Sequence, residues 1–139
     1  IWVGGGVTHG PLAEKNYKRK ITKSMRAQAL FSVLSKKFKD GEIIFVDSLA
    51  MSKMNTKEGV AVMNNLAKAT KIKTLSTSKK PKTLVALFGR SENAEKSFRN
   101  IAALDMVFLK NLNPLDVLNY QYLLIENPTE SVDFLAKRG

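Results

Sequence analysis

A run of cations that includes one aromatic side chain lies between residues 14 and 26 and suggests nucleic-acid chemistry. If a helix extends back to about Arg19, then Arg19, Lys23 and Arg26 share one face, and such a row can follow the phosphates of a nucleic acid. On charge alone, a solvated helix face explains the run equally well. The candidate RNA contacts in this run are Lys15, Tyr17, Lys18, Arg19, Lys20, Lys23 and Arg26.

A second candidate is the glycine-rich stretch over residues 2–11, which reads Trp-Val-Gly-Gly-Gly-Val-Thr-His-Gly-Pro. Its glycines let the backbone approach a sugar–phosphate surface closely, and its Trp and His side chains offer planes for base stacking. The stretch is not a dinucleotide loop, because no strand precedes it and the Gly-x-Gly-x-x-Gly spacing is absent. A flexible linker explains the composition about as well. The candidate contacts here are Trp2, Gly4, Gly5, Gly6 and His9.

A different class of function, a nucleotide-binding or phosphotransfer α/β enzyme, depends on polar residues that follow predicted strands. Asp47 ends one strand at the edge where α/β sheets usually place ligands, and Ser48, Glu92 and Asp105 could lie nearby. The turn over residues 89–91, Gly-Arg-Ser, could bind an anion at a helix N-terminus. Carboxylates at strand ends are more often helix caps or solvated groups, and a plain turn also explains residues 89–91, so this alternative ranks second.

The overall charge favours a polyanionic partner. The 139 residues contain 23 Lys and Arg against 12 Asp and Glu, a formal net charge of +11, and a compact body repels itself at this charge unless an anion neutralises it. Residues 1–40 hold nine of the cations and two of the acids, so the basic surface belongs mainly to the N-terminal third. The absence of cysteine and the single histidine argue against disulfides, metal sites and a Ser-His-Asp triad, and we expect no cofactor.

The apolar runs are about five or six residues long, far below the roughly 20 that a membrane helix needs, so we expect no membrane partner. The chain begins at Ile1, and no signal-peptide pattern follows. We interpret the chain as a fragment that lacks its N-terminal part.

From Gly41 onward, short apolar runs alternate with helical patterns, which is typical of βαβ units around a parallel sheet. We therefore predict a globular α/β domain over residues 21–139, with a mostly parallel sheet of about four strands flanked by helices in a Rossmann-like, three-layer arrangement. An extended basic RNA-binding arm is predicted over residues 1–20. The predicted strands are residues 43–47, 83–88, 106–109 and 122–125.

The predicted helices begin at residues that can cap a first turn. One helix is predicted over residues 23–38, a second begins after Asn55, and a third follows Ser91 and runs to about residue 102. Two Asn-Pro pairs, at 113–114 and 127–128, each combine a cap, a proline at the first helical position and an acid three residues after the cap. Residues 71–82 contain five lysines and no acid and are predicted to be a second basic connection.

Taken in order, these motifs resemble the large-subunit ribosomal protein four family. The resemblance runs from Trp2 to about Ile125. It rests on the stretch over residues 2–11, Tyr17 with the basic run leading to residues 26–35, the strand over 41–47, the Thr-Lys pair at 56–57, residues 98–101, and the Asn-x-x-Asp-x-Leu helix start at 113–118. The sequence departs from the family at residues 126–128, where Glu-Asn-Pro replaces the usual Thr, and in lacking the N-terminal portion and the tip of the family's long loop.

The resemblance implies a structural constituent of the large subunit of the cytoplasmic ribosome, not an enzyme. Its partners would be large-subunit ribosomal RNA and neighbouring ribosomal proteins, and the family's long loop reaches the polypeptide exit tunnel. The glycine-rich stretch looks like the returning end of that loop, and Lys57 and Arg99 become further candidate RNA contacts. Some bacterial members also repress their own operon by binding messenger RNA, and whether this chain does so stays open.

Overall fold

Four parallel strands form one sheet in the order β1-β4-β2-β3. The computed structural model describes residues 3–138. The strands are β1 (Ile43–Val46), β2 (Thr83–Leu87), β3 (Leu104–Phe108) and β4 (Tyr122–Glu126). The predicted parallel sheet is confirmed. Strand β3 begins two residues earlier than expected, because Leu104 and Asp105 pair with the first two residues of β2.

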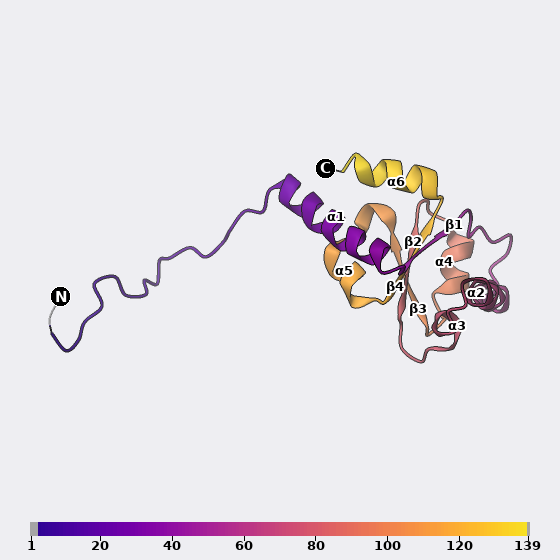
Figure 1. The fold of residues 1–139 in the computed structure, drawn as a ribbon, viewed down its shortest axis with the longest axis horizontal. Coiled ribbons are helices and arrows are strands. Elements are labelled where there is room, and N and C mark those ends of the chain that lie inside the picture. The colour runs from indigo at the N-terminus through magenta and orange to yellow at the C-terminus, as the bar shows by residue number, and fades with distance from the viewer. Residues whose placement is uncertain (1–2, 139) are drawn as a thin grey trace.

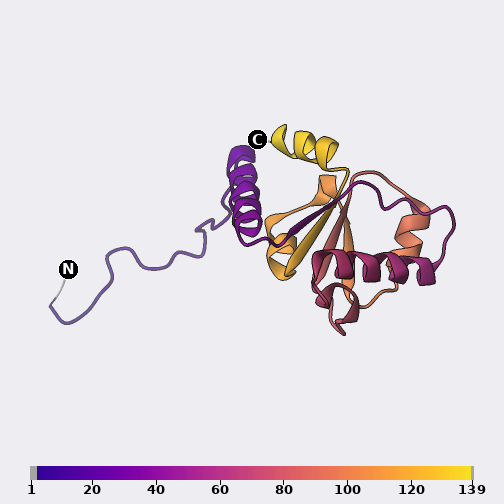
Figure 2. The same cartoon turned by 45° about the vertical axis from the view of Figure 1, so that its right-hand side comes forward.

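Helices cover both faces of this sheet, which confirms the three-layer arrangement (Figures 1 and 2). One layer holds α2 (Thr56–Thr70), the short α3 (Thr74–Thr77) and α4 (Glu92–Phe98). The other holds α1 (Lys23–Lys39), the 3-10 turn η1 (Leu109–Asn111), α5 (Pro114–Asn119) and α6 (Pro128–Ala136). In this strand order, the chain moves across the sheet in one direction from β1 to β2 and from β2 to β3, and it moves back from β3 to β4. Because such crossovers are right-handed, α2 and α4 lie on one face of the sheet and α5 lies on the other.

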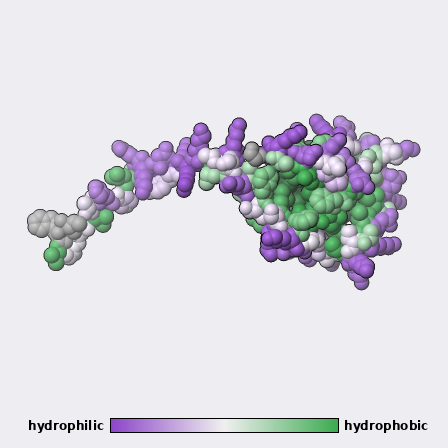
Figure 3. Space-filling model, turned by 45° about the horizontal axis from the view of Figure 1, so that its top comes forward, coloured by the Kyte–Doolittle hydropathy of each residue, from purple (hydrophilic) through white to green (hydrophobic). Residues whose placement is uncertain are grey.

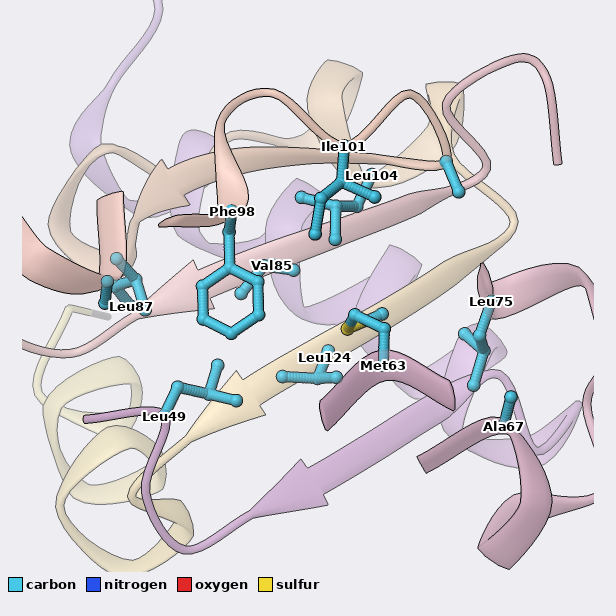
Figure 4. Close-up of a cluster of buried hydrophobic side chains, with 12 residues drawn as sticks. Leu49, Met63, Ala67, Leu75, Val85, Leu87, Phe98, Ile101, Leu104 and Leu124 are labelled. Carbon is cyan, nitrogen blue, oxygen red and sulfur yellow. The ribbon is translucent and has the colours of Figure 1, made fainter. Parts of the chain in front are cut away.

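The apolar core therefore consists of two clusters, one on each face of the sheet. Side chains of β2 and β4 alternate between them, because successive residues of a strand point to opposite faces. Figure 4 shows the cluster under α2 and α4, where Val85 and Leu124 meet Met63 and Phe98. The second cluster, under α1, α5 and α6, is formed by Leu30, Leu84, Ala86, Leu109, Leu112, Val117, Leu123, Ile125 and Leu135.

Most of the predicted helix starts are confirmed. The side chains of Asn55, Ser91 and Asn113 accept hydrogen bonds from the first turns of α2, α4 and α5. Helix α4 ends at Phe98 rather than near residue 102, because the amide of Ile101 turns back to the carbonyl of Phe98. The connection over residues 71–82 contains α3, which the sequence analysis did not predict.

The prediction for the second Asn-Pro pair is only half right. Helix α6 begins at Pro128 as expected, but Asn127 has a left-handed backbone with φ of 48° and its side chain makes no capping hydrogen bond. The backbone carbonyl of Asn127 accepts from the amide of Ser131, whose hydroxyl donates to the carbonyl of Glu126. The side chain that turns into this end of the helix is therefore Ser131 and not Asn127.

Candidate nucleic-acid interface

The N-terminal segment, defined here as residues 3–22, forms no helix, joins no strand of the sheet, and extends away from the body (Figure 1). All of its residues are exposed except the half-buried Gly10. Gly4 and Gly6 have φ values of 96° and 103°, and a Cβ atom at either would meet no atom within 4 Å. Backbone conformation, rather than close packing within the described chain, therefore selects glycine at these two positions.

The cationic run does not lie on one helix. The hydroxyl of Thr22 accepts a hydrogen bond from the amide of Met25 at 3.3 Å, and this cap starts α1 at Lys23. Arg19 thus precedes the helix, so the condition for a single face with Arg19, Lys23 and Arg26, a helix that extends back to Arg19, is not met. Lys23 and Arg26, three residues apart in the first turn, do lie together and line one groove.

The aromatic side chain in the run has a cation of the same segment beside it. The ammonium group of Lys15 lies 5.4 Å from the centre of the Tyr17 ring, and Tyr17 remains 77% exposed. The amide of Lys18 donates to the side-chain oxygen of Asn16 at 2.9 Å, which turns the backbone locally. Such an exposed ring with adjacent cations can stack on a base while the cations approach phosphates.

The cations between residues 15 and 26 carry no ion pair within the described chain. The three ion pairs found in residues 3–138 are Lys36–Asp40, Lys37–Glu42 and Lys96–Glu92. Hydrophilic residues gather along the part of the N-terminal segment next to α1 (Figure 3). Because the body's acids do not neutralise these charges, they are available to an external anion.

The remaining predicted contacts are not brought together with this run. Lys57 is exposed in the first turn of α2, and Arg99 is exposed at the end of α4, so both lie in the helix layer opposite α1. His9 and the three consecutive glycines are exposed in the N-terminal segment. Trp2 lies outside the described residues.

The carboxylates proposed for an enzyme do not meet. Asp47 follows the carboxyl end of β1, whereas Asp105 is the second residue of β3, near the amino end of the sheet, where it accepts a hydrogen bond from the Tyr120 hydroxyl at 2.7 Å. Ser48 accepts from the amide of Ala50, and Glu92 pairs with Lys96. Asp105 therefore does not join Asp47, because it lies near the amino end of β3 and not at the carboxyl edge of the sheet.

The carboxyl edge of the sheet holds a carboxylate that the sequence analysis did not assign. Glu126 accepts hydrogen bonds from the amide of Leu49 at 3.0 Å and from the amide of Phe88 at 3.3 Å. It thereby joins the loops after β1 and β2 and takes up donors that a bound phosphate would need. The signal in the sequence was the unusual acid at the end of the last strand.

The Gly-Arg-Ser turn over residues 89–91 also has a structural role, because it starts α4. Ser91 accepts from the amide of Ala94 and caps α4, whose first turn contains Glu92 and Glu95. These acids already complement the positive end of the helix dipole and oppose an approaching anion. Within residues 3–138, no group of three or more His, Cys, Asp or Glu side chains could hold a metal ion, and none of the described helices is long and apolar enough to cross a membrane.

A sequence model of the family described as Ribosomal protein L4/L1 matches residues 1–137. A protein of Mycoplasma mycoides named Large ribosomal subunit protein uL4 is 41% identical over 124 residues, which cover 89% of this chain and 55% of the relative. Its namesake from Natranaerobius thermophilus is 31% identical over 132 residues, covering 95% of this chain and 58% of the relative.

A third namesake, from Desulfotalea psychrophila, is 30% identical over 138 residues, which cover 99% of this chain and 58% of the relative. The chain thus spans just over half the length of these relatives. Their shared name denotes a ribosomal protein and not an enzyme, and the family match extends over nearly every residue. The resemblance drawn from the sequence motifs is confirmed, and the chain belongs to the Ribosomal protein L4/L1 family.

Proposed function

We propose that this chain is part of a structural protein of the large ribosomal subunit in the cytoplasmic ribosome, and that it binds large-subunit ribosomal RNA. The arm over residues 1–20 and the first turn of α1 lie against the RNA, while residues 21–139 form the body that anchors them. The glycine-rich stretch belongs to the loop that the family directs toward the polypeptide exit tunnel. Neighbouring large-subunit proteins complete the set of partners.

The observation that carries the proposal is the continuous, unpaired cationic run. From Lys15 to Arg26 the side chains are exposed, and none is in an ion pair with an acid of the described chain. Phosphate contacts supply most of the sequence-independent affinity for nucleic acid, and each requires a cation that no internal acid neutralises. The family match and the names of the relatives support ribosomal RNA as the polyanion.

The body contributes the placement of this run. Helix α1 is fixed to the sheet through Leu30 in the core and through the buried Lys37 near its C-terminal end. The first turn, with Lys23 and Arg26, therefore has a set position relative to the body, whereas the N-terminal segment extends from it. The residues named for the enzyme alternative do not support it, since Glu126 takes up amide groups at the carboxyl edge and Asp47 and Asp105 lie at opposite ends of the sheet.

The test is binding of the chain to large-subunit ribosomal RNA of Mycoplasma mycoides, measured by filter binding over a series of salt concentrations. We expect the affinity to fall steeply with salt. Replacing Arg19, Lys23 and Arg26 together by Gln should make the negative slope of log K against log salt shallower by roughly two to three units. Each lost phosphate contact reduces the magnitude of this slope by about 0.7 to 0.9.

The matched control replaces three exposed lysines outside the run, Lys39, Lys53 and Lys68, by Gln. It removes the same charge, so a change equal to that of the first variant would mean that net charge alone drives binding. An unchanged affinity in the first variant would defeat the assignment of the run. Isothermal titration with nucleotides should give no heat, and measurable heat would revive the enzyme alternative.

A further inference from the structure

A groove of about 750 Å³ lies beside the first turn of α1, between it, the turn that joins η1 to α5, and the end of the chain after α6. The start of α1 and the end of α6 lie side by side in both ribbon views (Figures 1 and 2). Ile21, Met25 and Leu112 contribute apolar surface to the groove. Lys23, Arg26 and Arg138 contribute cations from two distant parts of the chain, and no acidic residue is among those that line it.

Arg138 is held in place by backbone carbonyl groups. Its guanidinium donates to the carbonyl of Leu112 at 2.9 Å, to that of Lys110 at 2.7 Å and, more weakly, to that of Leu109 at 3.5 Å. Carbonyl oxygens orient the guanidinium but leave its positive charge in place, and no ion pair of the described chain includes Arg138. A guanidinium has five donors in a planar fork, so donors remain for an anion.

The cations and apolar side chains of the groove indicate which kind of ligand it can bind. Three cations with no acid among the lining residues complement a polyanion, and the exposed apolar side chains of Ile21 and Met25 between them can contact a sugar or base. The groove is also continuous with the cationic run, because Lys23 and Arg26 belong to both. A nucleic-acid strand that follows the run would enter the groove without turning away from the protein.

We propose that this groove binds the sugar–phosphate backbone of large-subunit ribosomal RNA, with Arg138 as an anchored phosphate ligand opposite Lys23 and Arg26. The inference rests on the proposed function and extends it from the N-terminal segment to the body. It assigns an RNA contact to the C-terminal end of the chain, far in sequence from the basic run. The orientation by three carbonyl groups distinguishes Arg138 from the exposed lysines elsewhere on the surface, whose side chains must be ordered when they bind.

The first test compares Arg138→Gln with Arg90→Gln in the salt series with Mycoplasma mycoides large-subunit RNA. Both variants lose one exposed arginine, but Arg90 lies in the turn before α4 and does not line the groove. We expect Arg138→Gln to weaken binding about tenfold and to lower the salt slope by about one unit, as for a lost phosphate contact. Arg90→Gln should change neither. Arg138→Lys, which keeps the charge, should keep most of the slope.

The second test locates the RNA directly and does not depend on the stability of an Arg138 variant. The chain contains no cysteine, so a single Asn111→Cys substitution in the groove can carry a tethered iron chelate that cleaves nearby RNA with hydroxyl radicals. We expect discrete cleavage of the bound RNA from this position. Lys68→Cys, on α2 in the opposite helix layer, is the control and should give little or none.

The outcomes separate this inference from the proposed function. Salt-dependent binding that is unaffected by Arg138→Gln, together with cleavage no stronger from position 111 than from position 68, would overturn the groove and leave the run as the RNA contact. A chain that does not bind the RNA at all would overturn both. A loss of binding in Arg138→Gln and in Arg138→Lys alike, without cleavage from position 111, would show a structural role only and would also reject the groove.

Discussion

The ammonium group of Lys37 lies 2.6 Å from the carboxylate of Glu42, and it also donates to the carbonyl of Gln121 at 2.8 Å. Lys37 is 8% exposed, so these contacts join the end of α1 to the sheet within the protein. At the start of the same helix, Lys23 and Arg26 are exposed and in no ion pair of the described chain. The helix thus uses Lys37, near its C-terminal end, for folding and presents Lys23 and Arg26, at its start, to solvent.

This division predicts that Lys37→Met destabilises the fold without changing RNA binding. The substitution keeps the apolar part of the side chain but leaves Glu42 and the carbonyl of Gln121 without their partner, which should cost about 2 kcal/mol of the free energy of unfolding. Lys36→Met is the control, since its pair with Asp40 is exposed and screened by solvent and should contribute little to stability. Urea unfolding of both variants measures the difference, and equal losses would contradict the structural role of Lys37.

The hydrogen bonds of Glu126 lead to a second prediction. Glu126→Ala leaves the amides of Leu49 and Phe88 without their acceptor, so we expect a loss of about 2 kcal/mol and faster hydrogen exchange at these two amides. Asp133→Ala, an exposed acid in α6, should change the stability by less than about 0.5 kcal/mol. If the exchange rates of the two amides did not rise in Glu126→Ala, the carboxylate would not be what holds the loops after β1 and β2.

The layers of this fold were predictable because local patterns determine them. Strands such as β2 are buried on both faces, so they appear in the sequence as uninterrupted apolar runs between capped helices. Contacts between distant residues were not predictable: Glu126 meets Leu49 across 77 positions, and Arg138 meets Leu112 across 26. Spacing along the chain carries no information on which distant amide or carbonyl faces a given side chain.

In the candidate interface, too, residue spacing alone did not predict the local structure. The cations from Lys15 to Arg26 were identified by type and charge balance, but their shared helical face was inferred from spacing alone. Thr22 caps α1 and stops the helix from reaching Arg19. The helix itself was predicted to begin at Lys23, where the structure has it, and the shared face required an extension to Arg19 that the Thr22 cap prevents.

Asn is required for different reasons in the two Asn-Pro pairs, for its side-chain cap at position 113 and for its backbone conformation at position 127. At position 113 the Asn side chain accepts from the amide of Asp116 at 2.8 Å, and Ser can replace it as a cap, so Asn113→Ser should change the stability by only a few tenths of a kcal/mol, about as little as a cap exchange does. At position 127 the requirement is a positive φ, so Asn127→Ser should cost about 1 kcal/mol.

Thermal unfolding of the two serine variants, with Asn127→Gly as the control, measures this difference. Glycine adopts a positive φ without strain, so Asn127→Gly should unfold close to the temperature of the unmodified protein. If Ser were tolerated equally well at both positions, the left-handed conformation of Asn127 would not govern the start of α6.

The hydrogen bond from Tyr120 to Asp105 predicts an alkaline titration that can be assigned to one residue. The bond to the Asp105 carboxylate, with some burial and the negative charge of that carboxylate, raises the pKa of Tyr120 from 10.0 to about 12. Because the pKa is raised in the folded state, the bond contributes its full stabilisation below pH 10 and loses it as the pH rises through about 12. Tyr120→Phe should therefore destabilise the chain at neutral pH, and the difference should shrink across this range.

Near-ultraviolet absorbance of the phenolate provides the measurement. The chain has three tyrosines, and the component that titrates at about 12 should be absent in Tyr120→Phe. In Asp105→Asn, which removes the negative charge and weakens the acceptor, the pKa of Tyr120 should fall back toward 10.0. A component at about 12 that persisted in Asp105→Asn would mean that burial and the negative charge of Asp116, and not the Asp105 carboxylate, raise the pKa of Tyr120.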